Sequence, residues 1–247
     1  YEADFKQFYQ FLCILYEHHL SICNNFTPYY SFDSFYMKKN VFLIIGLAVW
    51  IPASFLEAGI VRNYAPHAPI EIGLHPSGAD ARTERVAADL CRAGFAAEAR
   101  SNVMAWKASK LLTNAVSTLD AVCGSRAGLD DVCAAVKQEG MACYRAAGIE
   151  TVAGAEYEAR VAFAVAAMGE IEGAPRAGGS STQSLARGLA SIETDYVNGE
   201  IVLLGRTFGV PTPVNEAIVR SAHALAAKQR VGPFTPAELR RRIEQRA

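Results

Sequence analysis

The chain has 247 residues, of which 51% are hydrophobic, and its formal net charge is −1. This balance is ordinary for a soluble globular enzyme with one large domain or two small ones. No basic face or Lys/Arg run stands out except the arginines of "ELRRRIEQRA", which are expected on a solvated last helix. The composition therefore gives no reason to expect a nucleic-acid partner. A cytoplasmic protein is expected because the apolar run 41–56 favours a strand over a membrane anchor.

The cysteines indicate a reducing compartment. None belongs to a CxxC pair, and no Cys/His spacing matches a zinc site, so no metal is expected. Each is expected to be a small buried apolar residue rather than a nucleophile. The six are Cys13, Cys23, Cys91, Cys123, Cys133 and Cys143.

The N-terminal part is the least informative. Residues 1–40 receive no assignment, because they show neither helical nor clean strand periodicity. The apolar run 41–56 follows two lysines, which is typical of a signal peptide or membrane anchor. It is shorter than the roughly 20 residues of a spanning helix, and Pro52 interrupts it. Its β-branched and aromatic residues favour a buried strand, so a membrane association is not expected.

Residues 59–100 predict the end of an α/β unit. Two short strands are expected in 59–73, joined by a turn near Pro66. Apolar spacing in 79–94 predicts an amphipathic helix that stops at Gly94, and "FAAEAR" supplies another strand.

From Asn102 onward, helix follows helix with short connections, which predicts an all-helical domain. Thr212 and Thr235 each precede a proline, and this pair is typical of a helix start. The predicted helices cover 104–122, 127–148, 154–170, 191–209, 212–228 and 235–245.

The first of these helices carries polar residues on an otherwise apolar sequence. Lys110 and Asn114 are four residues apart and share a face, and Ser117 lies a further turn along. A buried lysine without a partner is unfavourable. From spacing alone, the simplest interpretation is that its stem packs while its ammonium group reaches water.

A second polar cluster lies in "GGSSTQSLARGLASIETDYVNGE". Ser181 is expected in a glycine-rich loop, and Glu193 is expected to open the next helix behind Ser191 as its cap. The local interpretation leaves Asp195 and Asn198 solvated.

The two clusters together resemble the ketopantoate reductases, the 2-dehydropantoate 2-reductases. "KLLTN" is similar to the K-L-x-x-N helix of that family, and "SST…ETDYVNG" is similar to its serine loop and E-x-D-x-x-N-G motif. "GVPTPVN", "EAGIV" and "IEIG" match further stretches, so the resemblance covers roughly residues 45–230. It implies a mostly α fold: 41–101 as a truncated Rossmann-like remnant of an NADP-binding α/β domain, then 102–247 as an all-helical domain resembling that of 6-phosphogluconate dehydrogenase.

The resemblance also implies roles. In that family, hydride passes from NADPH to the ketone of the 2-keto acid ketopantoate, which gives pantoate for pantothenate and coenzyme A biosynthesis. Lys110 matches the general acid, and Asn114 could hold a substrate hydroxyl or carbonyl. Ser181 matches the serine that binds the substrate carboxylate, and Glu193 matches the glutamate at the nicotinamide ribose. Lys107 competes for the role of the acid, but the four-residue gap to Asn114 favours Lys110.

Two departures from the family pattern matter. A second asparagine is usual on the lysine helix, and Ser117 is the best match for it here; its hydroxyl is shorter and bonds differently. The chain also has no G-x-G-x-x-G turn, and its first glycine is Gly46. The sequence therefore leaves open whether the chain binds NADPH, and it also leaves open whether the chain forms a homodimer. The alternative function is a non-catalytic helical association module that has lost cofactor binding.

Overall fold

The computed structural model describes residues 44–176, 178–188 and 192–245. The chain divides into two units between Leu43 and Ile44, and the described residues all belong to the second. The expectations for residues 1–40 lie outside the described residues, as does the start of the 41–56 segment.

A small mixed sheet forms the α/β part. The strand order is β1-β4-β5, with β1 antiparallel and β5 parallel to the central strand β4. A separate hairpin joins β2 to β3. The strand interpretation of the apolar run is confirmed for its described part, although Pro52 divides it into two strands. The strands are β1 (Ile45–Val49), β2 (Ala53–Glu57), β3 (Ile60–Asn63), β4 (Pro69–Leu74) and β5 (Ala96–Ala99). No helix among the described residues is long and apolar enough to cross a bilayer.

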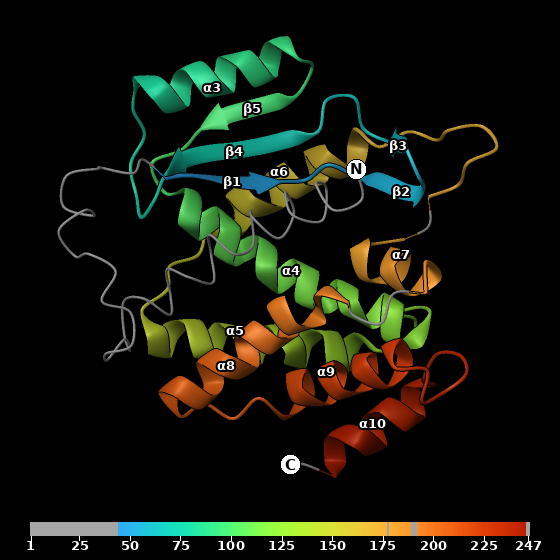
Figure 1. Ribbon diagram of the computed structural model, residues 1–247. Helices are drawn as coiled ribbons and strands as arrows, with labels where there is room; N and C mark the ends of the chain where they lie inside the picture. Colours follow the sequence, from blue (N-terminus) through green and yellow to red (C-terminus); the bar gives the residue numbers. More distant parts are fainter. Residues whose placement is uncertain (1–43, 177, 189–191, 246–247) are drawn as a thin grey trace, which may run out of the picture. The chain divides into compact units, whose positions relative to one another are not determined.

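Helix α3 (Ala81–Arg92) crosses from β4 to β5 and covers one face of the sheet (Figure 1). Its N-terminus is closed by Asp80, whose carboxylate accepts hydrogen bonds from the backbone N–H groups of Arg82 and Thr83. Thr83 completes a capping box, and Gly94 follows the helix end with φ +97°, which suits glycine. The predicted amphipathic helix is confirmed.

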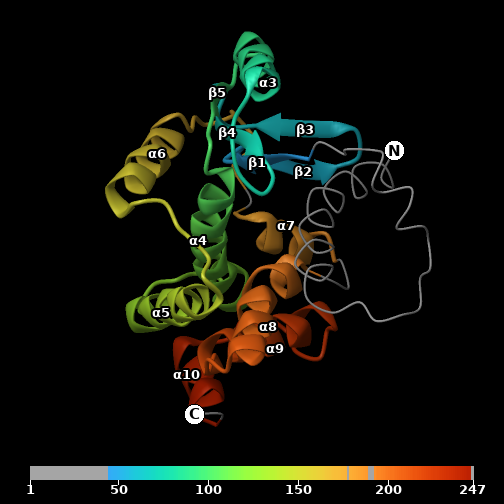
Figure 2. The ribbon, with the colours of Figure 1, turned by 90° about the vertical axis from the view of Figure 1, so that its left-hand side faces the viewer.

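The opposite face of the sheet rests on helices α4 (Val103–Cys123) and α6 (Gly154–Ala166) (Figures 1 and 2). The sheet and α4 approach so closely that β4 needs a glycine at the contact. A Cβ built on Gly73 would lie 2.2 Å from the Arg100 carbonyl oxygen and 2.8 Å from the Val103 Cβ.

A buried carboxylate connects this face of the sheet to α6. Glu71 of β4 is fully buried and accepts hydrogen bonds from Arg100 Nε at 2.6 Å and from Arg160 Nε of α6. Both arginines also pair with Glu98, at 2.7 Å and 3.0 Å. Burial alone would lower the pKa of Arg100, but its hydrogen bond with Glu71 and the charges of Glu71, Glu98 and Glu156 together raise it.

The rest of the described chain is helical, and no described residue from 103 to 208 lies in a strand. Its core is formed mainly by α4, α5, α8 and α9, with buried aliphatic residues such as Leu119, Val136, Ile201 and Ile218. The fold is therefore mostly α with a small sheet, as predicted. The further helices are α5 (Asp130–Ala147), α7 (Ser180–Ala186), the 3₁₀ turn η1 (Glu193–Tyr196), α8 (Asn198–Phe208), α9 (Pro213–Ala226) and α10 (Pro236–Glu244).

Two predicted details were wrong. The segment 191–209 is not one helix, because η1 is followed by Val197 with non-helical dihedrals before α8 begins. Ser181 lies in the first turn of α7 rather than in a loop, and Gly179 takes the position before that helix. The division of the chain near residue 102 stays a prediction.

The two Thr-Pro starts differ in how they are capped. Thr235 forms the expected capping box with Glu238. Thr212 precedes α9, but its side chain makes no capping bond. Glu139 of α5 replaces it, because its carboxylate accepts from the backbone N–H groups of Val214 and Asn215 at 2.9 and 3.0 Å.

The cysteines only partly follow the prediction that they are buried. Cys143 is buried, and Cys123 and Cys133 are half-buried, but Cys91 is exposed on α3. The apolar spacing of 79–94 placed Cys91 on the inner face, whereas only Thr83 and Ala87 of that helix are fully buried. No group of His, Cys, Asp or Glu in the described part of the chain is arranged to hold a metal ion.

Candidate active site

Helix α4 presents the three polar residues singled out in its sequence. Lys110 and Ser117 are half-buried and Asn114 is exposed, while Leu112, Ala115 and the residues that follow on their side enter the core. The Ser117 hydroxyl donates to the Thr113 carbonyl at 3.1 Å, so its own lone pairs stay available to a donor. The helix thus buries one side and keeps a polar strip on the other.

The lysine at the start of this strip lies next to the α/β part. Its ammonium nitrogen is 5.7 Å from the centre of the Trp50 ring, which follows β1. Trp50, Trp106 and Tyr157 form an aromatic group with ring centres 6.0–6.1 Å apart. A tryptophan face attracts a cation, so the Lys110 ammonium gains a favourable contact beside Trp50.

The same aromatic group is tied to α4 by hydrogen bonding. The Tyr157 hydroxyl lies 2.9 Å from the Thr113 Oγ1. Burial raises the pKa of Tyr157, and its hydrogen bonds with Thr113 and Trp50 act in the opposite direction. Its phenol therefore stays protonated near neutral pH.

Ser181 and Glu193 lie on elements that pack near α4. Helix α7 contacts α4, and η1 contacts α7. Ser181 is buried and Glu193 is half-buried. Next to Ser181, the Gln183 amide bonds the β2 backbone at Ala53 and Phe55, which fixes α7 against the hairpin. The elements that carry the two residues are therefore adjacent; that the side chains converge with Lys110 stays a prediction.

The two motif asparagines have a structural role that the sequence did not reveal. Asn198 was expected to be solvated, but it is fully buried. Its amide donates to the Ala115 carbonyl at 3.1 Å and to the Asn215 Oδ1 at 3.0 Å, and Asn215 in turn donates to Glu139 at 2.6 Å. This chain of bonds joins α4, α8, α9 and α5. Asp195 is exposed as expected, and it lies 2.7 Å from the His223 Nε2.

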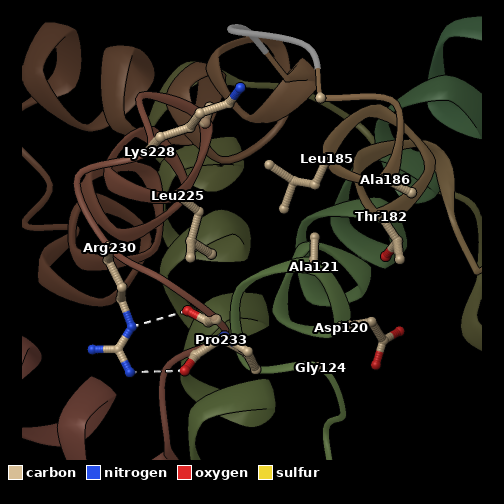
Figure 3. A pocket seen from close by; sticks show the side chains of 13 residues that line it. Asp120, Ala121, Gly124, Thr182, Leu185, Ala186, Leu225, Lys228, Arg230 and Pro233 are labelled. Atoms are coloured by element: carbon tan, nitrogen blue, oxygen red, sulfur yellow. Dashed lines mark hydrogen bonds between the residues drawn. The ribbon is translucent and has the colours of Figure 1, made fainter.

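A pocket of about 440 Å³ lies beyond the polar strip, at the C-terminal end of α4 (Figure 3). None of the five predicted site residues lines it. The lining comes from α4, α7, the end of α9 and the loop that precedes α10: Asp120, Ala121, Gly124, Thr182, Leu185, Ala186, Gly188, Leu225, Ala226, Lys228, Arg230, Gly232 and Pro233.

Comparison with known proteins decides the family. The model described as "Ketopantoate reductase PanE/ApbA C terminal" matches residues 102–226, half of the chain. The chain belongs to the ketopantoate reductase family. A comparison with curated proteins finds no match.

Solved structures agree with this family at the level of the fold. A ketopantoate reductase of the PanE/ApbA family from Ralstonia eutropha JMP134 is 24% identical, with a TM-score of 0.59 over 75% of this chain and 60% of that one. A 2-dehydropantoate 2-reductase from Methylococcus capsulatus is 20% identical, with a TM-score of 0.62 over 77% and 65%. A D-mandelate dehydrogenase in complex with NADH is 20% identical, with a TM-score of 0.59 over 75% and 63%. The chain thus spans less than two thirds of each relative.

The family is one of oxidoreductases that use a nicotinamide cofactor, so the described residues can be tested for a fit to such a dinucleotide. The parallel unit β4-α3-β5 is the type of unit that binds a pyrophosphate at its helix N-terminus. In α3, however, the Asp80 carboxylate already takes the first free N–H groups and adds a negative charge. A hydrogen bond and charge interaction with Arg82 help to hold the Asp80 pKa below its usual value. This end of α3 therefore does not fit a pyrophosphate.

Proposed function

We propose that the chain provides the keto-acid side of a ketopantoate-reductase-type enzyme, which reduces a 2-keto acid at the expense of NADPH. Ketopantoate is the expected substrate and pantoate the product. The observation that supports this best is the position of Lys110, half-buried on a polar strip of α4 and held against Trp50. Leucine or alanine would serve helix packing at this position, so the presence of a charged side chain supports a role in chemistry.

The roles follow from the chemistry of each side chain. As hydride adds to the ketone carbon, negative charge develops on the oxygen, and the Lys110 ammonium stabilises that charge and donates a proton to it. Asn114, one turn along, holds a substrate hydroxyl or carbonyl. The Ser117 hydroxyl, whose proton is used within the helix, accepts from a substrate hydroxyl.

The remaining two residues contact the carboxylate of the substrate and the ribose of the cofactor. Ser181 binds the carboxylate of the keto acid, and Glu193 meets the nicotinamide ribose. Because the end of α3 does not fit the pyrophosphate, the proposed roles concern the keto acid and the ribose, and the hydride would come from a cofactor whose phosphates are held elsewhere. Its phosphates need a binding site other than the end of α3, in this chain or on a partner.

The proposal is tested by ligand binding and by a matched pair of variants. Purified protein is titrated with NADPH by fluorescence and with ketopantoate by calorimetry, and turnover is followed by NADPH absorbance. Where turnover is measured, Lys110→Ala should lower it by roughly 10²-fold or more, the usual range for a lost general acid.

Lys107→Ala is the control, because Lys107 is three residues earlier on the same helix and equally half-buried. It should change turnover little. Equal losses in both variants would show a general effect of charge on α4 and would refute the assignment of the acid.

A non-catalytic association module is the second candidate. The observation that favours it is the N-terminus of α3, which its own Asp80 occupies. NADPH binding in the micromolar range would argue against this candidate. No binding of NADPH at millimolar concentration, together with no binding of ketopantoate, would support it.

A further inference from the structure

The pocket at the end of α4 has an apolar interior. Leu185 and Leu225 lie on opposite sides of it, and Ala121 and Pro233 also line it (Figure 3). Its volume of about 440 Å³ lies within the range of small-molecule sites. An apolar body of moderate size therefore fits it.

Two of the three charged residues that line this pocket, Asp120 and Arg230, already have partners. Asp120 pairs with Arg126 at 3.0 Å. Arg230 is fully engaged, because its guanidinium binds Glu238 through two nitrogens and donates to the carbonyls of Gly232 and Pro233. Figure 3 shows that guanidinium turned toward the loop carbonyls.

Lys228 is different. It is exposed at the edge of the pocket, and its ammonium has no carboxylate partner among residues 44–176, 178–188 and 192–245. Its side chain extends along the rim (Figure 3). The pocket thus combines an apolar interior with one cation that is available to a ligand.

The backbone at Lys228 gives a second, independent observation. Lys228 has φ +54° and is the sole residue other than glycine with positive φ in the described part of the chain. It follows α9, where its N–H bonds the Leu225 carbonyl at 3.0 Å and the Gln229 N–H bonds the Ala224 carbonyl at 2.9 Å. These two bonds define a Schellman motif, whose left-handed position is usually glycine.

A side chain at that position is unfavourable for an L-residue. Attraction between the Lys228 ammonium and the C-terminal end of α9 does not explain why a lysine occupies this left-handed position, because a lysine elsewhere in the last turn would gain the same interaction without positive φ. Residues kept in an unfavourable backbone conformation tend to cluster at ligand sites.

We propose that this pocket binds an amphipathic organic monoanion, a carboxylate with an apolar chain or ring. The apolar part lies between Leu185 and Leu225, and the carboxylate pairs with Lys228. The site is separate from the proposed reductase site and does not depend on it.

Octanoate is a suitable probe and octanamide its neutral analogue. Calorimetry should give an octanoate Kd on the order of 0.1–1 mM, as for a small ligand with one charged contact. Octanamide should bind at least about tenfold more weakly, because the charge-assisted hydrogen bond is lost.

Lys228→Gly separates ligand binding from stability. This variant should weaken octanoate binding by about tenfold or more, because the charge is lost. It should also raise Tm by about 2–4 °C, because glycine removes the strain at φ +54°. Lys228→Gln should weaken octanoate equally without the gain in Tm. Ala186→Phe, at an exposed lining position, should fill the pocket and also abolish binding.

Two controls make the proposal refutable. Lys137→Gln removes an exposed lysine that does not line the pocket and should leave the octanoate Kd unchanged. Lys110→Ala should also leave it unchanged. Full octanoate affinity in Lys228→Gly would overturn the proposal, as would an equal loss in Lys137→Gln. If octanoate binding were lost in Lys110→Ala but retained in Lys228→Gly, octanoate would be assigned to the keto-acid site instead.

Discussion

The buried carboxylate of Glu71 offers the sharpest test of the fold. Glu71→Gln keeps the size of the side chain but removes the charge that faces two arginines. The amide oxygen can still accept from Arg100 or from Arg160, but the NH₂ group then faces the donors of the other arginine. The variant therefore loses at least one charge-assisted hydrogen bond and leaves an arginine, 25% or 11% exposed, without its main partner.

The size of the effect follows from this geometry. A hydrogen bond to a charged group contributes about 1.5–3 kcal/mol, and breaking a buried ion pair from one side destabilises by about 3–5 kcal/mol. Glu98, which is 49% exposed, still pairs with both arginines and reduces the loss. We expect the free energy of unfolding to fall by about 3 kcal/mol.

Urea unfolding, followed by tryptophan fluorescence and far-ultraviolet circular dichroism, measures this change. With a slope of about 2 kcal/mol per molar urea, the midpoint should decrease by roughly 1.5 M. Glu57→Gln is the control: its pair with Arg62 spans a similar 2.9 Å, but Glu57 is 61% exposed, so the loss should stay below about 1 kcal/mol. Equal midpoints for the two variants would refute the argument that burial makes the Glu71 pair important.

Three further predictions concern single positions. Exposed Cys91 should be alkylated by iodoacetamide at about pH 8 well before Cys123, because burial raises the pKa of Cys123 to about 11. Peptide mass spectrometry measures the alkylation rate of each cysteine, and equal rates would contradict this prediction. Hydrogen bonds from the backbone N–H of Thr235 and from the Arg230 side chain lower the pKa of Glu238 from 4.5 to about 2, so this carboxylate stabilises the fold above pH 4.5 and the contribution is lost as the pH falls toward 2. Glu238→Gln should therefore flatten the dependence of Tm on pH in this window, and an unchanged slope would be evidence against this stabilising role. Gly73→Ala should destabilise by about 1–3 kcal/mol in urea unfolding, because its Cβ would lie 2.2 Å from a backbone oxygen; no loss would show that the sheet and α4 can move apart.

Local signals predicted most of the secondary structure. The Thr-Pro pair at Thr235 and the glycine at Gly148 mark helix ends through bonds within a few residues, and the structure has those ends. The apolar run before Pro52 was correctly favoured as strand.

Features that depend on distant residues could not be predicted. Asn198 lies in the mostly polar stretch 193–200 of the sequence, but its partners are Ala115 and Asn215, which other helices supply. Nothing local to Lys228 indicates positive φ, since the glycine that usually marks this position is absent. For the candidate site, the spacing of Lys110 and Asn114 on one helix was predictable. Its aromatic partner Trp50 was not, because that contact joins α4 to the end of β1.

The carboxylate of Glu139 has a consequence for how the helical part forms. It satisfies the first N–H groups of α9 from α5, 75 residues earlier in the chain. An isolated α9 segment lacks that cap, and a helix of 14 residues is marginal in water by itself. The first turn of α9 therefore becomes stable only once α5 has docked. In native-state hydrogen exchange, the amides of Val214 and Asn215 should open together with α5 as one cooperative unit.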